Sequence, residues 1–229
     1  MNILAIDTSG PTCGVALLAG GLVRFTATVL NKRTHSVNLM PMVDAAFAAT
    51  GLTLTDMDRL ACVVGPGSFT GVRLGVSTVK GLAHGSGKPC VAVNALEAMA
   101  HGAGRFEGAI CPMQDARAGQ VYAALFRRGV RIAPDEPIAL TELLERLTAS
   151  GEPVLFTGDG MTAHREKIAG IMGKQACFAD PAFACLRPEA VAEIGAASED
   201  TTDYLGLQPL YLRAPSAERN KRLMEAQHE

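Results

Sequence analysis

The residues best suited to chemistry lie in two short polar segments, each directly after an apolar stretch. Asp7-Thr8-Ser9 follows apolar residues 2–6, and Gly65-Pro66-Gly67-Ser68-Phe69-Thr70 follows apolar residues 60–64. A glycine turn that leads into a helix presents free N–H groups and a partial positive charge, which suit a phosphate. Asp7 would act beside it through Mg²⁺ or water, as a hard oxygen ligand. The candidate nucleotide- or phosphate-facing residues are Asp7, Thr8, Ser9, Gly65, Gly67, Ser68 and Thr70.

Both segments also have a purely structural interpretation. Gly65-Pro66-Gly67 must break a buried strand, and Ser68 or Thr70 can cap the helix that follows. The Gly-x-x-x-x-Gly-Lys-Ser/Thr pattern of a Walker A loop is absent. Asp-Thr-Ser-Gly at 7–10 also occurs in aspartic proteases, but these need two carboxylates that share a proton, and this sequence has one copy.

No pattern in the sequence indicates a metal centre or a catalytic triad. The six cysteines form no Cys-x-x-Cys pair, and most lie in apolar stretches, as buried reduced thiols do. No two of the five histidines have the spacing of metal ligands. The five are His35, His84, His101, His164 and His228. We therefore predict no catalytic residue and no metal ligand in this chain.

The composition is that of a globular protein that does not bind nucleic acid by itself. Its 229 residues carry 21 Lys and Arg against 23 Asp and Glu, a net charge of −2. A protein that binds nucleic acid alone is usually more basic. The sequence shows neither a signal peptide nor a long apolar span, so we expect a cytoplasmic protein that does not enter a membrane.

Two predicted helices, 36–50 and 71–84, have too little polar surface for helices that face water. The first has few polar residues, and the second has a narrow polar strip with small or apolar residues elsewhere. Such helices must be covered by the protein's own core or by a partner. We favour a helical-bundle interface over a buried pair within one domain. The predicted interface residues are Val37, Met40, Val43, Asp44, Phe47, Phe69, Gly71, Val72, Arg73, Gly75, Val76, Val79 and Lys80.

The order of predicted elements indicates an α/β fold in two similar halves. Three strands and a helix come first, followed by strand, helix, strand and helix, and a weaker version of this order follows. This order suits an actin-like, ribonuclease-H-like protein with two mixed-sheet subdomains. In the second half, Thr141 is predicted to cap a helix, and Gly158-Asp159-Gly160 to form a turn facing a ligand. The predicted divisions are an N-terminal subdomain with the dimerisation helices (1–104), a C-terminal subdomain (105–215) and a mobile tail (216–229).

Four segments closely resemble the TsaB family, also called YeaZ. They are Ile3-Leu4-Ala5-Ile6-Asp7-Thr8, Gly65-Pro66-Gly67-Ser68-Phe69-Thr70-Gly71-Val72-Arg73-Leu74-Gly75, Asp115-Ala116-Arg117 and Pro209-Leu210-Tyr211-Leu212-Arg213. The resemblance covers the first half firmly and the second half by short landmarks. It implies the actin-like ATPase (ASKHA) fold. It also implies a place in the complex that forms N6-threonylcarbamoyladenosine at position 37 of tRNA.

The resemblance also implies partners. In the family, the first two helices form a dimer surface with a paralogue, TsaD, which holds the metal and performs the transfer; an ATPase, TsaE, joins them. In TsaD-like relatives, the segment matching 94–99 carries His-x-x-x-His, which binds a metal. Here those positions are Ala95 and Met99, which are poor ligands. We therefore predict a non-catalytic scaffold subunit without a cofactor of its own, with ATP or ADP and Mg²⁺ held at an interface with partners.

Alone, the chain should form a homodimer through the same helices. We expect contact with tRNA only within the complex, and the candidate basic residues are Arg73, Lys80, Arg117, Arg127, Arg128 and Arg131. Two other functions stay open. One is a stand-alone small ATPase or kinase-like enzyme that uses Asp7 and the glycine segments 65–67 and 158–160. The weaker one is a protease that acts on a partner.

Overall fold

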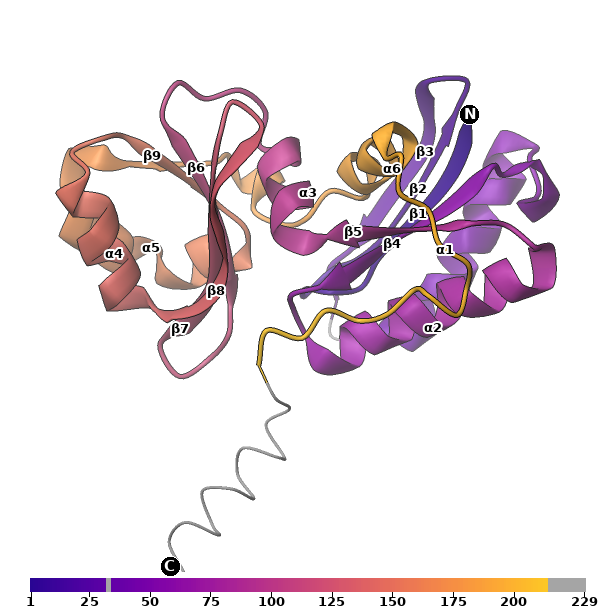
Figure 1. Ribbon diagram of the computed structural model, residues 1–229, viewed down its shortest axis with the longest axis horizontal. Helices are drawn as coiled ribbons and strands as arrows, with labels where there is room; N and C mark the ends of the chain where they lie inside the picture. The colour runs from indigo at the N-terminus through magenta and orange to yellow at the C-terminus, as the bar shows by residue number, and fades with distance from the viewer. Residues whose placement is uncertain (32–33, 214–229) are drawn as a thin grey trace, which may run out of the picture.

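The computed structural model describes residues 1–31 and 34–213, and its two five-stranded sheets share one topology (Figure 1). The first sheet has the order β3-β2-β1-β4-β5, and the second has the order β8-β7-β6-β9-β10. In each, a central strand (β1 or β6) pairs antiparallel with the next strand and parallel with a later one. The strands are β1 (Asn2–Asp7), β2 (Cys13–Ala19), β3 (Leu22–Val29), β4 (Arg59–Gly65), β5 (Cys90–Asn94), β6 (Ala109–Asp115), β7 (Gln120–Arg127), β8 (Val130–Ala139), β9 (Val154–Thr157) and β10 (Ala176–Phe178).

Along the chain, three helices alternate with the strands of each sheet, and they follow the strands in the same order in both halves. The helices are α1 (His35–Thr50), α2 (Phe69–Ser86), α3 (Ala95–Gly102), α4 (Leu140–Ala149), α5 (Asp159–Met172) and α6 (Pro188–Ala197). Short 3₁₀ turns cover Leu54–Asp56, Gly173–Gln175 and Pro181–Phe183. The predicted fold of two similar mixed-sheet halves is confirmed. None of the described helices combines the length and apolar character that crossing a bilayer requires.

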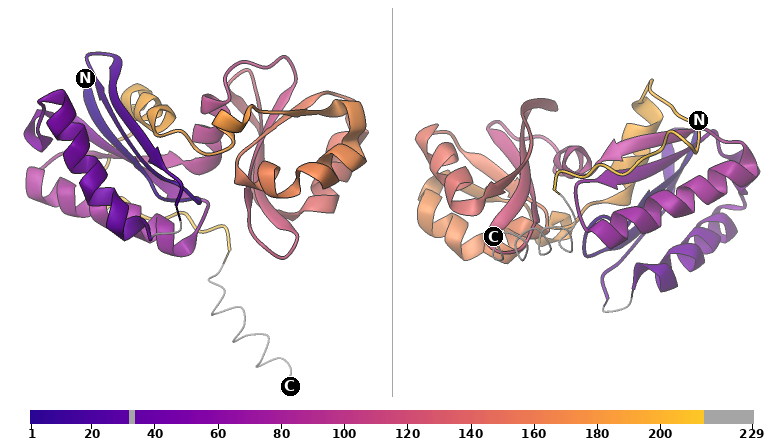
Figure 2. Two further views of the ribbon diagram at one scale, coloured as in Figure 1. Left: turned by 180° about the vertical axis from the view of Figure 1, so that it is seen from behind. Right: turned by 60° about the horizontal axis from the view of Figure 1, so that its bottom comes forward.

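The helices and sheets form alternating layers with three apolar cores. Helices α1 and α2 cover one face of the first sheet, and α4 and α5 cover the outer face of the second (Figures 1 and 2). Helices α3 and α6 lie between the two sheets. The central core joins both halves, because Ile3 of β1, Leu96 of α3, Phe126 of β7 and Val191 of α6 belong to one buried cluster.

The last part of the chain returns to the first sheet, which corrects the predicted subdomain 105–215. Helix α6 packs on β1, β2 and β4. It approaches so closely that a Cβ at Gly195 would lie 2.7 Å from the Cβ of Ala61. Beyond α6, Thr202 exchanges two backbone hydrogen bonds with Cys90, and the Leu210 N–H donates to the Val64 carbonyl at 2.7 Å. The second lobe is therefore built from the residues before α6, and the predicted tail 216–229 lies outside the described residues.

Local signals predicted most helix boundaries. The Ser68 hydroxyl accepts from the Gly71 N–H at the start of α2, and the Asn94 side chain accepts from the Glu97 N–H at the start of α3. Thr141 does not cap α4, whose N-cap is Ala139. The segment 158–160 is not a free turn but the start of α5.

Gly71 and Gly75 of α2 serve contact with the β1–β2 turn rather than with another helix. A Cβ at Gly71 would lie 2.0 Å from the Thr8 carbonyl oxygen, and one at Gly75 would lie 2.6 Å from Thr8 Oγ1. Both distances are far below van der Waals contact. Only glycine therefore lets α2 lie this close to the β1–β2 turn.

We expect Gly71→Ala to lower the free energy of unfolding by about 1–3 kcal/mol, because the new methyl group would overpack against backbone. Gly81→Ala is the matched control on the same helix, since no atom lies within 4 Å of a Cβ there. It should raise stability by about 0.5–1 kcal/mol through helix propensity. Urea unfolding measures the free energy of unfolding of both variants. Equal changes in the two variants would contradict the assigned close contact at Gly71.

Candidate functional site

The structure brings the two predicted polar segments together at one edge of the first sheet. They follow β1 and β4, which pair in parallel with Ile6 beside Cys62, so the carboxyl ends of both strands meet there. The Ser68 N–H donates to the Ser9 carbonyl at 2.7 Å, and the Thr8 hydroxyl donates to the Gly71 carbonyl at 2.7 Å. The β1–β2 turn and the α2 N-terminus are therefore bonded directly to each other.

This bonding leaves the glycine segment poorly suited to a phosphate. A Cβ at Gly67 would lie 2.3 Å from the Ser9 carbonyl oxygen, and one at Gly65 would lie 2.5 Å from the Leu210 carbonyl oxygen. Both glycines thus allow one backbone to approach another. Asp7, Thr8 and Ser9 are buried, and Ser68 uses its N–H within the chain. The predicted nucleotide-facing residues do gather in space, but as an interlocked pair of turns, and we derive no step that involves a nucleotide there.

Asp7 is a buried carboxylate with half of its bonding capacity unused. It is 0% exposed. Its Oδ1 accepts from the Ser9 N–H at 2.8 Å and from the Ser9 hydroxyl at 2.7 Å. Its Oδ2 has no hydrogen-bond partner among the described residues. Burial raises the pKa of Asp7 from 3.8 to about 6, because removal from water disfavours the charged form more than the Ser9 bonds favour it.

Two further polar side chains from the second lobe face the same junction. Gln114, near the end of β6, is 2% exposed, and neither of its amide atoms has a partner among the described residues. Its Nε2 lies 3.9 Å from where a Cβ of Gly10 would be. Burial also raises the pKa of Asp159 to about 6, and the negative charges of Asp115 and Asp7 add to the shift. We call Asp7, Gln114 and Asp159 the interlobe polar cluster.

The interlobe polar cluster places two carboxylates, Asp7 and Asp159, where removal from water disfavours their charged forms. No group of three His, Cys, Asp or Glu side chains in residues 1–31 and 34–213 is placed to bind a metal. Sequence reasoning missed Gln114, and it placed Asp159 only in a turn facing a ligand. The available signal was their position, because each lies at or just after the carboxyl end of a strand in the second sheet.

The predicted interface residues separate into an outer and an inner group. Val37, Met40, Asp44 and Arg73 are exposed, and Phe47, Phe69 and Lys80 are half-buried. The remaining six lie in the core of their own lobe, which corrects their assignment to an outward face; they are Val43, Gly71, Val72, Gly75, Val76 and Val79. Val76, for example, is 3% exposed and packs with the first sheet. The side of α2 that is apolar in sequence is the side that faces this sheet.

The outer face of α1 is an apolar surface that its own lobe leaves uncovered. Val37 is 54% exposed and Met40 is 41% exposed. Pro41, Ala45 and Ala48 are exposed on the same helix. The helix buries Leu39, Met42, Val43 and Ala46 against the sheet. An apolar set on the outer side of an already packed helix marks a contact surface.

The start of α2 is fastened by the last described residues of the chain. Arg73 Nε donates to the Tyr211 hydroxyl at 2.7 Å, and its guanidinium carbon lies 3.8 Å from the centre of the Phe69 ring. The Phe69 and Tyr211 rings lie 4.9 Å apart. Phe69, one of the predicted interface residues, thus packs against the C-terminal segment. Ala95 and Met99, which are predicted to stand where TsaD-like relatives carry metal-binding histidines, are both buried in the central core.

We expect Asp7→Asn to stabilise the protein at pH 7 and to have no effect near pH 4. An aspartate whose pKa is raised in the folded state gives its full stability below pH 3.8 and loses it as the pH rises through about 6. The loss amounts to about 3 kcal/mol, since a tenfold change in proton affinity corresponds to about 1.4 kcal/mol. Asparagine can still accept both Ser9 bonds.

Urea unfolding between pH 4 and pH 8 tests this expectation. Asp44→Asn, which changes an exposed carboxylate on α1, is the control. A stability difference between Asp7→Asn and the native chain that does not vary with pH would refute the proton-linked cost.

Comparisons with known proteins agree with this architecture. A family model described as TsaD, tRNA N6-adenosine threonylcarbamoyltransferase, matches residues 29–214. The tRNA threonylcarbamoyladenosine biosynthesis protein TsaB of Bacillus subtilis is 37% identical over 222 residues, which cover 95% of this chain and 96% of that protein. The protein of the same description from Haemophilus influenzae is 32% identical over 226 residues, which cover 93% of this chain and 94% of that protein.

Solved structures give the same result. YeaZ from Pseudomonas aeruginosa superposes with a TM-score of 0.75 at 27% identity, covering 92% of this chain and 99% of that one. Component A of (R)-2-hydroxyglutaryl-CoA dehydratase from Acidaminococcus fermentans shares the fold alone, with a TM-score of 0.53 at 10% identity over 86% of this chain and 98% of that one. The expected actin-like ATPase fold is confirmed. The chain belongs to the TsaB (YeaZ) family of tRNA threonylcarbamoyladenosine biosynthesis proteins.

Proposed function

We propose that this chain is a non-catalytic subunit that scaffolds the tRNA threonylcarbamoyladenosine complex by pairing through α1 and α2 with a TsaD-type transferase. The family places the chain in this biosynthesis. The observation that carries the pairing is the exposed apolar face of α1, whose largest exposed side chains are Val37 and Met40. We place the complex in the cytoplasm, and we place TsaE and tRNA as partners of the assembled complex.

The match to the TsaD family model over residues 29–214 supports a partner of related build. Two proteins with one architecture can meet helix to helix, and a second copy of this chain can occupy the same face when no transferase is present. Asp44, an exposed acid, lies beside this apolar face and would select partners by charge.

The absence of an activity of its own is part of the proposal. It is supported by the side chains at the positions predicted to match the metal-binding histidines of TsaD-like relatives, since Ala95 and Met99 offer no good ligand and are buried. It is also supported by the bonding between the β1–β2 turn and α2, which occupies groups that a phosphate would need. We therefore place ATP or ADP with Mg²⁺ at an interface with partners. The interlocked turns do not favour a stand-alone ATPase.

We expect Met40→Glu to weaken self-association and pairing with a TsaD-type protein by at least about tenfold, because a charge would be buried at the contact. Ile171→Glu is the matched control. Ile171 is also 41% exposed and also lies on a helix, α5, but in the other lobe.

Light scattering measures self-association, and co-elution with the purified transferase measures pairing. Both variants should unfold at the same urea concentration as the native chain, since both side chains are exposed. Undiminished pairing of Met40→Glu would refute the assigned surface, and transferase activity from the chain alone would refute the non-catalytic role.

A further inference from the structure

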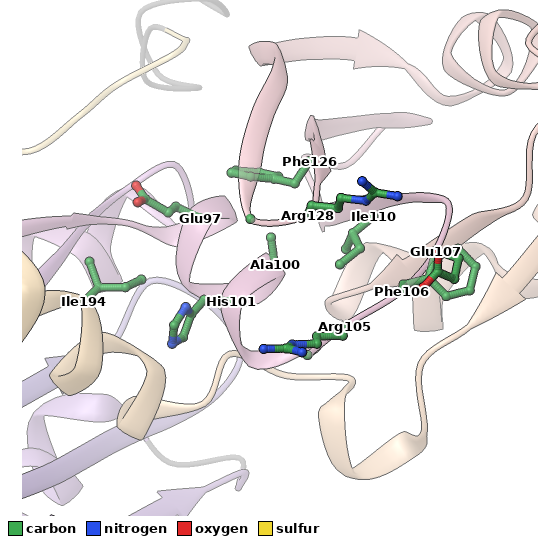
Figure 3. Close-up of a pocket in the computed structure, with 12 residues that line it drawn as sticks. Glu97, Ala100, His101, Arg105, Phe106, Glu107, Ile110, Phe126, Arg128 and Ile194 are labelled. Atoms are coloured by element: carbon green, nitrogen blue, oxygen red, sulfur yellow. The ribbon is translucent and has the colours of Figure 1, made fainter. Parts of the chain in front are cut away.

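A pocket of about 670 Å³ opens where the two lobes join, away from the outer face of α1 and from the interlobe polar cluster (Figure 3). Its walls come from α3, the linker 103–108, strands β6 and β7, the β7–β8 turn and α6. Both lobes therefore contribute to it. This volume lies within the range of about 300–1,000 Å³ that is usual for small-molecule sites.

The inner surface of the pocket is apolar. Ile110 of β6 and Phe126 of β7 line it and are almost fully buried. Ala100 of α3 and Ile194 of α6 line the side formed by the helices. Figure 3 shows Ala100 and Ile110 between the charged residues of the rim. A ligand that fills this space must present an apolar or aromatic body to it.

The charged rim has more unpaired cations than unpaired anions. Arg105 of the linker and Arg128 of the β7–β8 turn are exposed, and neither has a hydrogen bond or ion pair within residues 1–31 and 34–213. Figure 3 shows them on opposite sides of Ala100 and Ile110.

Of the two acids that line the pocket, one has an ion-pair partner. Glu97 lies 3.8 Å from Arg131, a neighbour of the pocket, and His101 is 2.7 Å from Glu193. Glu107 is the one lining acid without a partner among the described residues. Two free guanidinium groups thus face one free carboxylate. Because guanidinium binds carboxylate and phosphate through paired N–H donors, the rim favours an anionic group on the ligand.

We propose that this pocket binds a small organic anion, with an aromatic or apolar body against Phe126 and Ile110 and a phosphate or carboxylate held by Arg105 and Arg128. Such a ligand contacts both lobes and covers the linker that joins them. The inference does not depend on the proposed pairing with a transferase, because α1 and α2 take no part in the pocket.

Titration of the full-length chain at low salt tests the proposal with two probes, AMP for a phosphate and 2-naphthoate for a carboxylate. Adenosine, which lacks the charge, is the matched ligand control. We expect at least one anion to bind, and the double variant Arg105→Gln/Arg128→Gln to bind it at least about tenfold more weakly. Arg24→Gln, which removes an exposed charge from β3, should leave binding unchanged.

Binding of AMP alone would assign a phosphate ligand, and binding of 2-naphthoate alone would assign a carboxylate ligand. Failure of both probes to bind, adenosine binding as tightly as AMP where AMP is the anion bound, or equal weakening by Arg24→Gln would overturn the proposal. Trypsin cleavage after Arg105 gives a second measurement. The bound anion should slow this cleavage in the native chain and lose that effect in Arg128→Gln.

Discussion

The packing of α3 and α6 between the two sheets is the interaction on which the rest of the molecule depends. Each of these helices ends one of the two similar halves, and α6 packs on the first sheet although its sequence follows the second. Their buried side chains, with those of both sheets, form one apolar core. Burial of such a core is the dominant favourable term in folding, so the two lobes are held together by the same force that folds each of them.

Close packing at the lobe junction also explains the unusual chemistry there. The ends of β1 and β6 face each other, and Asp7 and Gln114 are buried there with Asp159 half-buried beside them. Because burial destabilises the ionised form of Asp7, the pKa of this carboxyl rises to about 6. Asp7 lies at the carboxyl end of a strand, where many enzymes place an active-site residue. Here, however, the two adjacent turns are bonded to each other through Ser68 and Ser9. The geometry is that of a closed junction.

Function in this chain is therefore best sought on surfaces that its own core does not cover. The outer side of α1 presents Val37 and Met40 to solvent, while the opposite side of the same helix packs on the sheet. The pocket at the lobe junction is a second such surface, with unpaired arginines at its rim. The two surfaces lie on different parts of the molecule and share no residue.

Much of the architecture could be predicted from the sequence by itself. Apolar runs and glycine turns determined the strands of the first sheet, capping residues such as Ser68 and Asn94 determined helix starts, and the repeated order indicated two similar halves. Whether the apolar side of α2 would pack on its own sheet or on a partner could not be predicted, because glycine and valine suit a helix–helix contact as well as a helix–sheet contact. Only the tertiary structure showed that Gly71 admits the Thr8 carbonyl, that α6 crosses to the first sheet and that Gln114 is enclosed. Each of these results from contacts between residues far apart in the chain, and local sequence patterns carry no information on such distances.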